Sequence, residues 1–193
     1  MAFWFFALGI PLTLFGAYAL ARPEGAAQLL VRFPRNAKAG VVLCAIGWLG
    51  TAYEVDTIGI EVFDRIVRRF WFLQNDIPGA VWILAAVLTV LTCLWMANLL
   101  PIRGLAAILM LYPAELFPAV RLCDTPWRLT LVVFAYLSAT AGMFGMFYPW
   151  RIRQVWAWIA AGRIRILAYG AFHAAWGVLF LVLGALAVAG FMK

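Results

Sequence analysis

Four ionisable residues lie inside or at the edges of long apolar stretches, where an unpaired charge is costly. They are Glu54, Asp56, Glu115 and His173. A charged side chain within hydrocarbon costs at least about 2.5–3.5 kcal/mol, so residues of this kind usually bind ions, relay protons or pair with one another. Carboxylates and an imidazole are suited to all three roles. These four residues therefore form the candidate intramembrane polar site.

Glu54 continues a line of small residues spaced three or four positions apart, as on one face of a helix. The line consists of Gly40, Cys44, Gly47 and Thr51. Small residues let helices approach closely in a membrane, so Glu54 is expected to face protein instead of lipid. Asp56 lies about 200° further round the same helix. The structural alternative is that both carboxylates reach the membrane surface or pair with Arg65 or Arg121.

Glu115 stands between Pro113 and Pro118, which would free backbone carbonyls in a helix. An interrupted helix with a carboxylate is how transporters and channels build cation sites, although a helix can also simply end this way at the interface. His173 is the only histidine and follows Gly170 by one turn. A Glu115–His173 pair could relay protons if their helices touch. The alternative is a neutral histidine bonded to a serine or a backbone carbonyl.

The stretches that carry these residues are long enough to cross a bilayer, which takes about 20 apolar residues of helix. They cover residues 2–21, 39–60, 79–100, 104–120, 129–148 and 166–192. With 67% hydrophobic and 12% charged residues and a mean hydropathy of +0.97, a soluble domain of 193 residues could not bury its apolar surface. We predict an all-α integral membrane protein, one polytopic domain over residues 1–193. It would be a bundle of six transmembrane helices, or of five if 39–60 or 104–120 is shallow or re-entrant.

Two connecting segments have the amphipathic pattern of helices that lie in the headgroup plane, Ile60–Leu73 and Trp150–Arg165. We interpret both as interfacial helices that tie loops to the membrane, with docking of a lipid substrate or partner as the alternative. On one side of the membrane, four arginines are candidate contacts for lipid phosphates: Arg65, Arg68, Arg69 and Arg121.

Basic residues also predict the orientation. Nine of them follow the first, third and fifth stretches, and six lie on the opposite side. Cytoplasmic loops carry the excess of Lys and Arg, so we expect both termini outside and loops 22–38, 101–103 and 149–165 in the cytoplasm. The expected location is a bacterial inner membrane.

Small residues at helical spacing predict where the other helices pack. Three further stretches carry such lines: Gly9, Thr13 and Gly16; Ala135, Ser138, Gly142 and Gly145; and Gly170, Ala174, Gly177 and Gly184.

The inventory excludes several kinds of chemistry. Lys38 and Lys193 are the only lysines and lie outside the spans, so no intramembrane Schiff base to retinal can form. One histidine cannot supply two axial haem ligands within this chain. Cys44, Cys93 and Cys123 show no spacing typical of a disulfide framework or a metal site. Phosphate-binding, protease and hydrolase motifs are absent, and no basic stripe suggests nucleic acid. No metal site is expected and the cofactor is unknown, although the deep tryptophans Trp48, Trp95 and Trp176 could line a pigment or quinone pocket.

These observations favour a small non-enzymatic membrane subunit or accessory protein of a larger assembly. It would provide helix-packing surface and contacts to lipid or cofactor. Its expected partners are membrane lipids and other membrane subunits or further copies of itself. The main alternative is a small channel or proton- or ion-coupled transporter that uses Glu54, Glu115 and His173. A second alternative is a lipid-processing enzyme at the headgroup plane.

Overall fold

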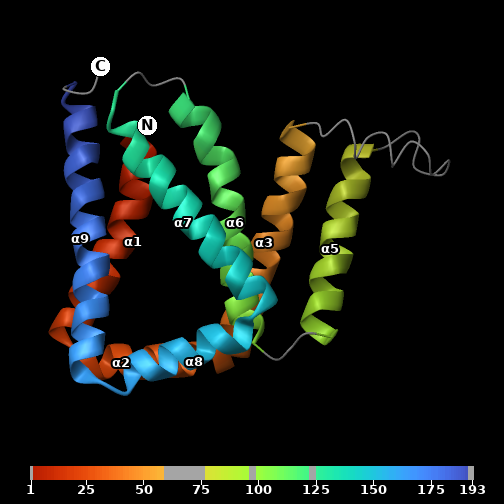
Figure 1. Ribbon diagram of the computed structural model, residues 1–193. Coiled ribbons are helices and arrows are strands. Elements are labelled where there is room, and N and C mark those ends of the chain that lie inside the picture. Colours follow the sequence, from red (N-terminus) through yellow and green to blue (C-terminus); the bar gives the residue numbers. More distant parts are fainter. Residues whose placement is uncertain (1, 59–76, 96–98, 122–124, 191–193) are drawn as a thin grey trace. The chain divides into compact units, whose positions relative to one another are not determined.

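Helices make up all of the regular structure that the computed structural model describes, which covers residues 2–58, 77–95, 99–121 and 125–190. The α-helices are α1 (Ala2–Ala21), α2 (Pro23–Arg32), α3 (Ala37–Ile58), α5 (Ile77–Trp95), α6 (Leu100–Arg121), α7 (Arg128–Phe147), α8 (Pro149–Ala160) and α9 (Arg163–Val188) (Figure 1). A short 3-10 turn, Phe33–Arg35, follows α2. For the described residues the predicted all-helical fold is confirmed.

Four of these helices are long and apolar enough to cross a membrane: α1, α6, α7 and α9, with 20 to 26 residues each. Helices of about 20 residues are about 30 Å long, which is the thickness of the hydrocarbon core. The other two expected spans correspond to α3 and α5. The side chains described in α5 form the apolar run Val81–Trp95, and α3 carries two acids near its end. Four membrane-compatible helices are therefore supported, and a count of six stays a prediction.

The α6 helix differs from the expectation in two ways. It begins at Leu100, so residues 101–103, expected as a loop, form its first turn. Pro101 is well tolerated there, because the first turn of a helix has no internal partner for the missing N–H. The helix then continues through Pro113 and Pro118 to Arg121 without interruption. The expected break is wrong, and Glu115 belongs to a continuous helix.

The chain forms two compact units that share α6 and α7. Unit 1 comprises Met1–Phe33, Leu116–Ser138 and Trp150–Lys193, and so contains α1, α2, α9 and most of α8. Unit 2 comprises Pro34–Glu115 and Ala139–Pro149, and so contains α3, α5 and most of α6.

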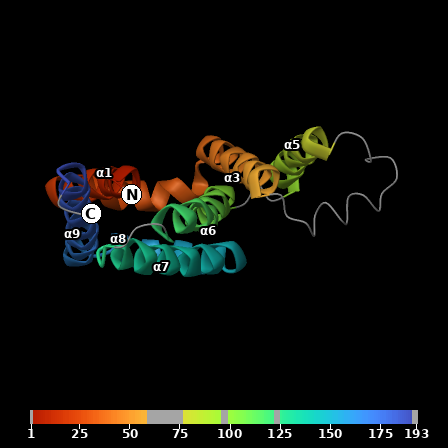
Figure 2. The ribbon, with the colours of Figure 1, turned by 90° about the horizontal axis from the view of Figure 1, so that it is seen from above.

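In unit 1 the helices α1 and α9 pack against each other along their lengths, as Figures 1 and 2 show. A Cβ atom added to Gly16 would lie 2.7 Å from the Cα of Ala174, and one added to Gly177 would lie 2.8 Å from the Cα of Thr13. Partners in α9 fall in number as those in α1 rise, so the two helices are antiparallel. The packing role predicted for their small residues is confirmed.

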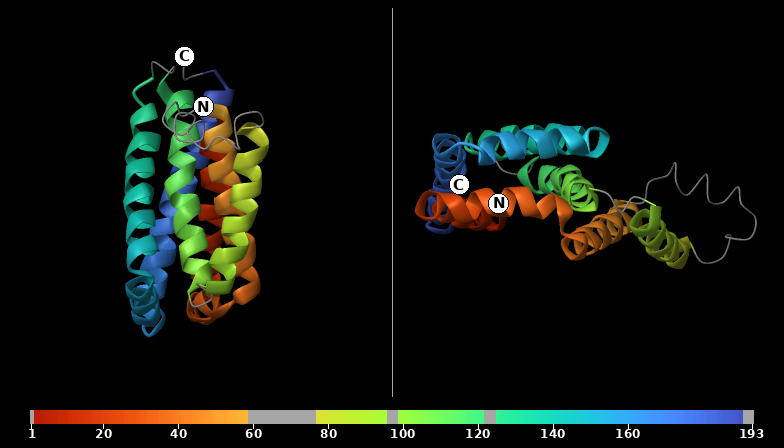
Figure 3. Two further views of the ribbon diagram at one scale, coloured as in Figure 1. Left: turned by 90° about the vertical axis from the view of Figure 1, so that its right-hand side faces the viewer. Right: turned by 90° about the horizontal axis from the view of Figure 1, so that it is seen from below.

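The helices α2 and α8 pack against one end of the α1–α9 pair, which Figure 3 shows from below. The buried cluster that joins the four helices consists of Ala19, Ala26, Leu30, Ile159 and Ile166. The ring of Phe33 lies 5.8 Å from that of Trp156, which extends the contact. A helix was expected over Trp150–Arg165, and α8 forms it as far as Ala160, while its position in the headgroup plane stays a prediction. The α2 helix was expected as part of a loop. Pro23 at its first position and Glu24 in its first turn are the start signals that were missed.

In unit 2 the helix α3 packs against α5 and α6. The indole Nε1–H of Trp48 donates a hydrogen bond of 3.1 Å to Oγ1 of Thr92, and Ala52 is buried against Ala85. The second half of α7 also packs on α6, where a Cβ added to Gly142 would lie 2.7 Å from Met110.

Candidate functional site

Hydroxyl groups in the apolar helices are satisfied locally. Thr13 donates to the carbonyl of Gly9 at 2.7 Å, and Thr51 donates to that of Gly47 at 2.9 Å. Ser138 does the same to the carbonyl of residue 134 at 2.8 Å. Such bonds to the preceding turn remove the need for another partner. The polar groups that still require an explanation are the carboxylates and the imidazole.

Glu54 and Glu115 are brought together by the way α3 lies along α6. A Cβ added to Gly40 would lie 3.0 Å from the ring nitrogen of Pro101, and one added to Gly47 would lie 3.0 Å from Cβ of Ala107. The members of these two pairs are 61 and 60 positions apart in the sequence. A constant separation means that the helices are parallel and keep their register. Continued by two turns, the same register places Glu54, which precedes Glu115 by 61 positions, opposite it.

The two carboxyl groups are close enough to interact electrostatically. Glu54 is 8% exposed, and Glu115 is partly buried. Among the described residues neither carboxylate has a salt bridge or a hydrogen bond. No fully enclosed side-chain oxygen or nitrogen in that part of the chain lacks a partner, so the oxygens of Glu54 must reach the surface. The prediction that Glu54 faces protein is confirmed, and its neighbour is another carboxylate.

The position of the pair along the helices favours a positively charged ligand. Glu54 is four residues from the end of α3, and Glu115 is six residues from the end of α6. These distances are about 6 and 9 Å along the helix axes. Both are C-terminal ends, where the helix dipole is negative, and the dipoles of parallel helices add. Two acidic groups near two negative helix ends can be relieved by one shared proton or by one bound cation.

His173 lies in unit 1, on α9. Its Nδ1–H donates a hydrogen bond of 2.8 Å to the backbone carbonyl of Tyr169. Its ring centroid is 5.2 Å from that of Phe15, 4.3 Å from that of Tyr169 and 5.6 Å from that of Phe172. A carbonyl oxygen can only accept, so Nδ1 carries the proton and the neutral ring presents a lone pair at Nε2. This nitrogen has no hydrogen bond within the described residues.

The expected Glu115–His173 relay joins groups of different units, and it stays a prediction. The alternative weighed for His173, a bond to a backbone carbonyl, is confirmed by Tyr169. Asp56 belongs to α3, but its side chain lies outside the described residues. Of the four arginines expected to contact lipid phosphates, Arg121 is exposed at the end of α6. The other three, Arg65, Arg68 and Arg69, lie outside the described residues, as does the helix expected over Ile60–Leu73.

The deep tryptophans each have a separate environment. Trp48 bonds Thr92 in unit 2, and Trp95 is largely exposed near the end of α5. Trp176 belongs to unit 1, where its ring centroid is 5.5 Å from that of Phe180. A pigment or quinone pocket lined by these tryptophans stays a prediction.

Sequence reasoning missed one pair of reactive side chains. The thiols of Cys44 of α3 and Cys93 of α5 lie close to each other, and both are free. Cys44 lies one turn before Trp48 on α3, and Cys93 directly follows Thr92 on α5. No spacing rule could find the pair, because the contact depends on how α3 and α5 pack. Within the described residues, no group of three or more His, Cys, Asp or Glu side chains gathers to hold a metal ion.

Comparison with known proteins gives no match: no protein-family model fits the sequence, and neither a curated protein nor a solved structure is detectably similar.

Proposed function

We propose that this chain is a six-helix membrane protein that takes up and releases a proton or a small cation at the Glu54–Glu115 pair. The observation that carries the proposal is the parallel register of α3 and α6, which sets two carboxylates opposite each other without a basic partner among the described residues. Structural carboxylates in apolar helices are normally paired with a cation. Two carboxylates without a cationic partner are expected in a protein whose function changes the charge of that pair.

The pair would work by alternating between a neutralised and a charged state. With a proton or cation bound, the two acids and the negative helix ends are compensated, and α3 and α6 can stay close. Loss of the ligand restores repulsion between the carboxylates. In the orientation expected from the basic residues, α3 and α6 both end on the outer face of a bacterial inner membrane. The ligand would therefore enter and leave from that face.

A second candidate is the accessory subunit of a larger membrane assembly. It is supported by the apolar surface that the chain leaves uncovered. In the most apolar 18-residue stretch of α1, and in that of α9, 22% of the residues are buried. Lipid alone can cover the rest. Partner proteins that remain bound in mild detergent at fixed stoichiometry would favour this function.

The test is ion flux in liposomes. The purified protein is reconstituted around a pH-sensitive dye, and an imposed potential or a gradient of Na⁺ or K⁺ is applied. We expect flux with the wild type, and loss of at least tenfold in Glu115→Gln and in Glu54→Gln. The matched control is Glu24→Gln, because Glu24 is an exposed glutamate of α2.

Two results would contradict the proposal. One is wild-type protein that conducts no proton or cation under any gradient. The other is flux that persists unchanged in the double variant of Glu54 and Glu115. Flux is measured separately under a proton gradient and under a gradient of Na⁺ or K⁺. The gradient that the wild type dissipates identifies the transported ion.

A further inference from the structure

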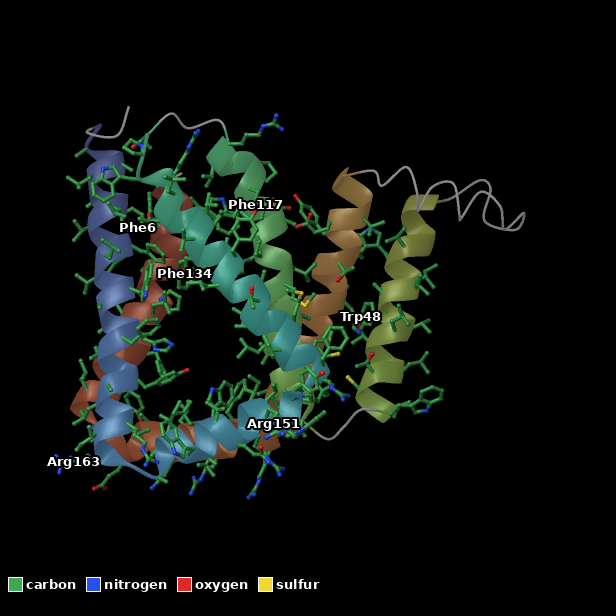
Figure 4. All side chains as sticks on the ribbon, viewed as in Figure 1. Phe6, Trp48, Phe117, Phe134, Arg151 and Arg163 are labelled. Carbon is green, nitrogen blue, oxygen red and sulfur yellow. The ribbon has the colours of Figure 1, made fainter. Side chains whose placement is uncertain are left out.

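The end of unit 1 closed by α2 and α8 carries a concentration of exposed positive charge. Six arginines lie on α2, on α8 and at the entry to these helices and to α9, and all are exposed: Arg22, Arg32, Arg151, Arg153, Arg163 and Arg165. Glu24 is the one acidic residue described on the same elements. We call these six residues the arginine platform. Figure 4 shows Arg151 and Arg163 extending away from the helices at this end.

Large apolar side chains are exposed between the arginines. Trp158 of α8 is 59% exposed, and Ile164 of α9 is 82% exposed. Leu29 of α2 and Val155 of α8 are also exposed. A surface that faces water or an acidic macromolecule would not present these side chains. A mixture of arginine and large apolar residues on short amphipathic helices fits the boundary between lipid headgroups and acyl chains.

Contacts with Trp158 fix the orientation of one arginine of the platform, Arg165. The guanidinium carbon of Arg165 lies 4.1 Å from the ring centroid of Trp158, and its Nη1–H donates a hydrogen bond of 3.0 Å to the carbonyl of Trp158. A guanidinium has five N–H donors in a fixed plane, so others stay available for an anion. Stacking on a tryptophan also holds the charge at the level of the headgroups, where tryptophan itself is favoured.

We propose that the arginine platform binds anionic phospholipid, with the arginines on the phosphates and the exposed apolar residues among the upper acyl chains. Charge complementarity identifies an anionic ligand, and the interleaved apolar side chains identify a lipid instead of a free anion. The platform involves none of the residues of the carboxylate pair, so this proposal goes beyond the proposed function and does not depend on it. It adds a lipid contact on α2 and α8 to the one expected from the sequence at other arginines, which stays a prediction.

The experiment measures retained lipid. Wild-type protein is purified in mild detergent and equilibrated with phosphatidylglycerol or phosphatidylcholine, and bound lipids are counted by native mass spectrometry. We expect phosphatidylglycerol to be retained at least tenfold more, with the preference falling as salt rises. Removal of Arg151 and Arg153 as Arg151→Gln/Arg153→Gln should weaken retention about fivefold per arginine. Arg165→Lys should weaken lipid retention less than Arg165→Gln, because lysine keeps the positive charge. Retention should still fall, because lysine lacks the planar guanidinium that stacks on Trp158.

The control variant is Gln154→Ala, at an exposed and uncharged residue of α8. It should retain phosphatidylglycerol as the wild type does, because no positive charge is removed. Equal retention of the two lipids by the wild type, or a loss in Gln154→Ala equal to that in the arginine variants, would overturn the proposal. Displacement of the lipid by millimolar inorganic phosphate, by RNA or by an acidic peptide would also overturn it, because the ligand would then be a free anion or a soluble partner. Glu115→Gln should leave retention unchanged, which separates this test from the test of flux.

Discussion

Glu54 of α3 lies opposite Glu115 of α6, in a register that the contacts of Gly40 and Gly47 hold over the preceding turns. Both residues come near the C-terminal ends of their helices, where the helix dipole is negative. Such an arrangement costs stability, and a protein keeps it where function needs it. The cost itself can be measured.

Neutralising one of the two acids should therefore stabilise the protein. At pH 8, Glu54→Gln should raise the free energy of unfolding by about 1–4 kcal/mol, the repulsion between two like charges a few ångströms apart near a protein surface. Reversible unfolding in mixed micelles measures it, with Glu24→Gln as the unchanged control. The double variant of Glu54 and Glu115 should gain less than the sum, because the first substitution already removes the repulsion. Additive gains would show that the two carboxylates do not interact.

The contact between α3 and α5 can be trapped through its own cysteines. Because the thiols of Cys44 and Cys93 lie close to each other, mild oxidation with a copper–phenanthroline catalyst should join them within one chain. The product is visible as a faster band on a non-reducing gel and as a linked peptide in mass spectrometry. Cys44→Ser should abolish it, whereas Cys123→Ser should not. Failure to cross-link in the folded protein would mean that the two helices meet in another register.

The packing of α1 on α9 depends on the absence of side chains at a few positions. Gly16→Leu places a side chain where the Cα of Ala174 already lies 2.7 Å from an added Cβ. Overpacking of this kind should lower the free energy of unfolding by about 1–3 kcal/mol or separate the helices. Ala17→Leu, at an exposed position of the same helix, is the control and should be near neutral. Equal stability of the two variants would contradict the α1–α9 contact.

The single histidine offers a spectroscopic test of its surroundings. With ¹⁵N-histidine labelling, His173 gives the only imidazole signals of the chain. The bond to the carbonyl of Tyr169 predicts that the neutral ring carries its proton on Nδ1. Nitrogen shifts typical of an Nε2–H ring would contradict the geometry. Phe15→Leu should shift the imidazole resonances, because the ring of Phe15 lies 5.2 Å from that of His173.

The sequence predicted which side of a helix packs against protein better than it predicted which other helix packs there. The side of α3 that carries Glu54 was predictable because Gly40, Cys44 and Gly47 mark the packed face. That this face meets α6 was not, because small residues promote close approach to any helix. For the same reason the sequence could not identify Glu115 as the neighbour of Glu54, nor Cys93 as the neighbour of Cys44.

Two local predictions were wrong or incomplete for identifiable reasons. A break in α6 was expected from Pro113 and Pro118, but proline is tolerated in apolar helices when neighbouring groups satisfy the freed carbonyls. The α2 helix was missed because the residues from Arg22 onward contain arginine and glycine typical of a loop. Pro23 favours the first turn of a helix, but it can be interpreted as a helix start only when α1 is known to end at Ala21.

The pairing of α1 with α9 has a consequence for how the protein is made. Among the described helices α1 leaves the ribosome first, whereas its partner α9 leaves it last. Most of unit 2 is formed by one stretch of chain, so α3, α5 and α6 can assemble as they emerge. The glycine-rich face of α1 must wait for about 140 residues of synthesis, roughly 7–28 s at bacterial to eukaryotic rates. During that interval lipid or the insertion machinery must shield it.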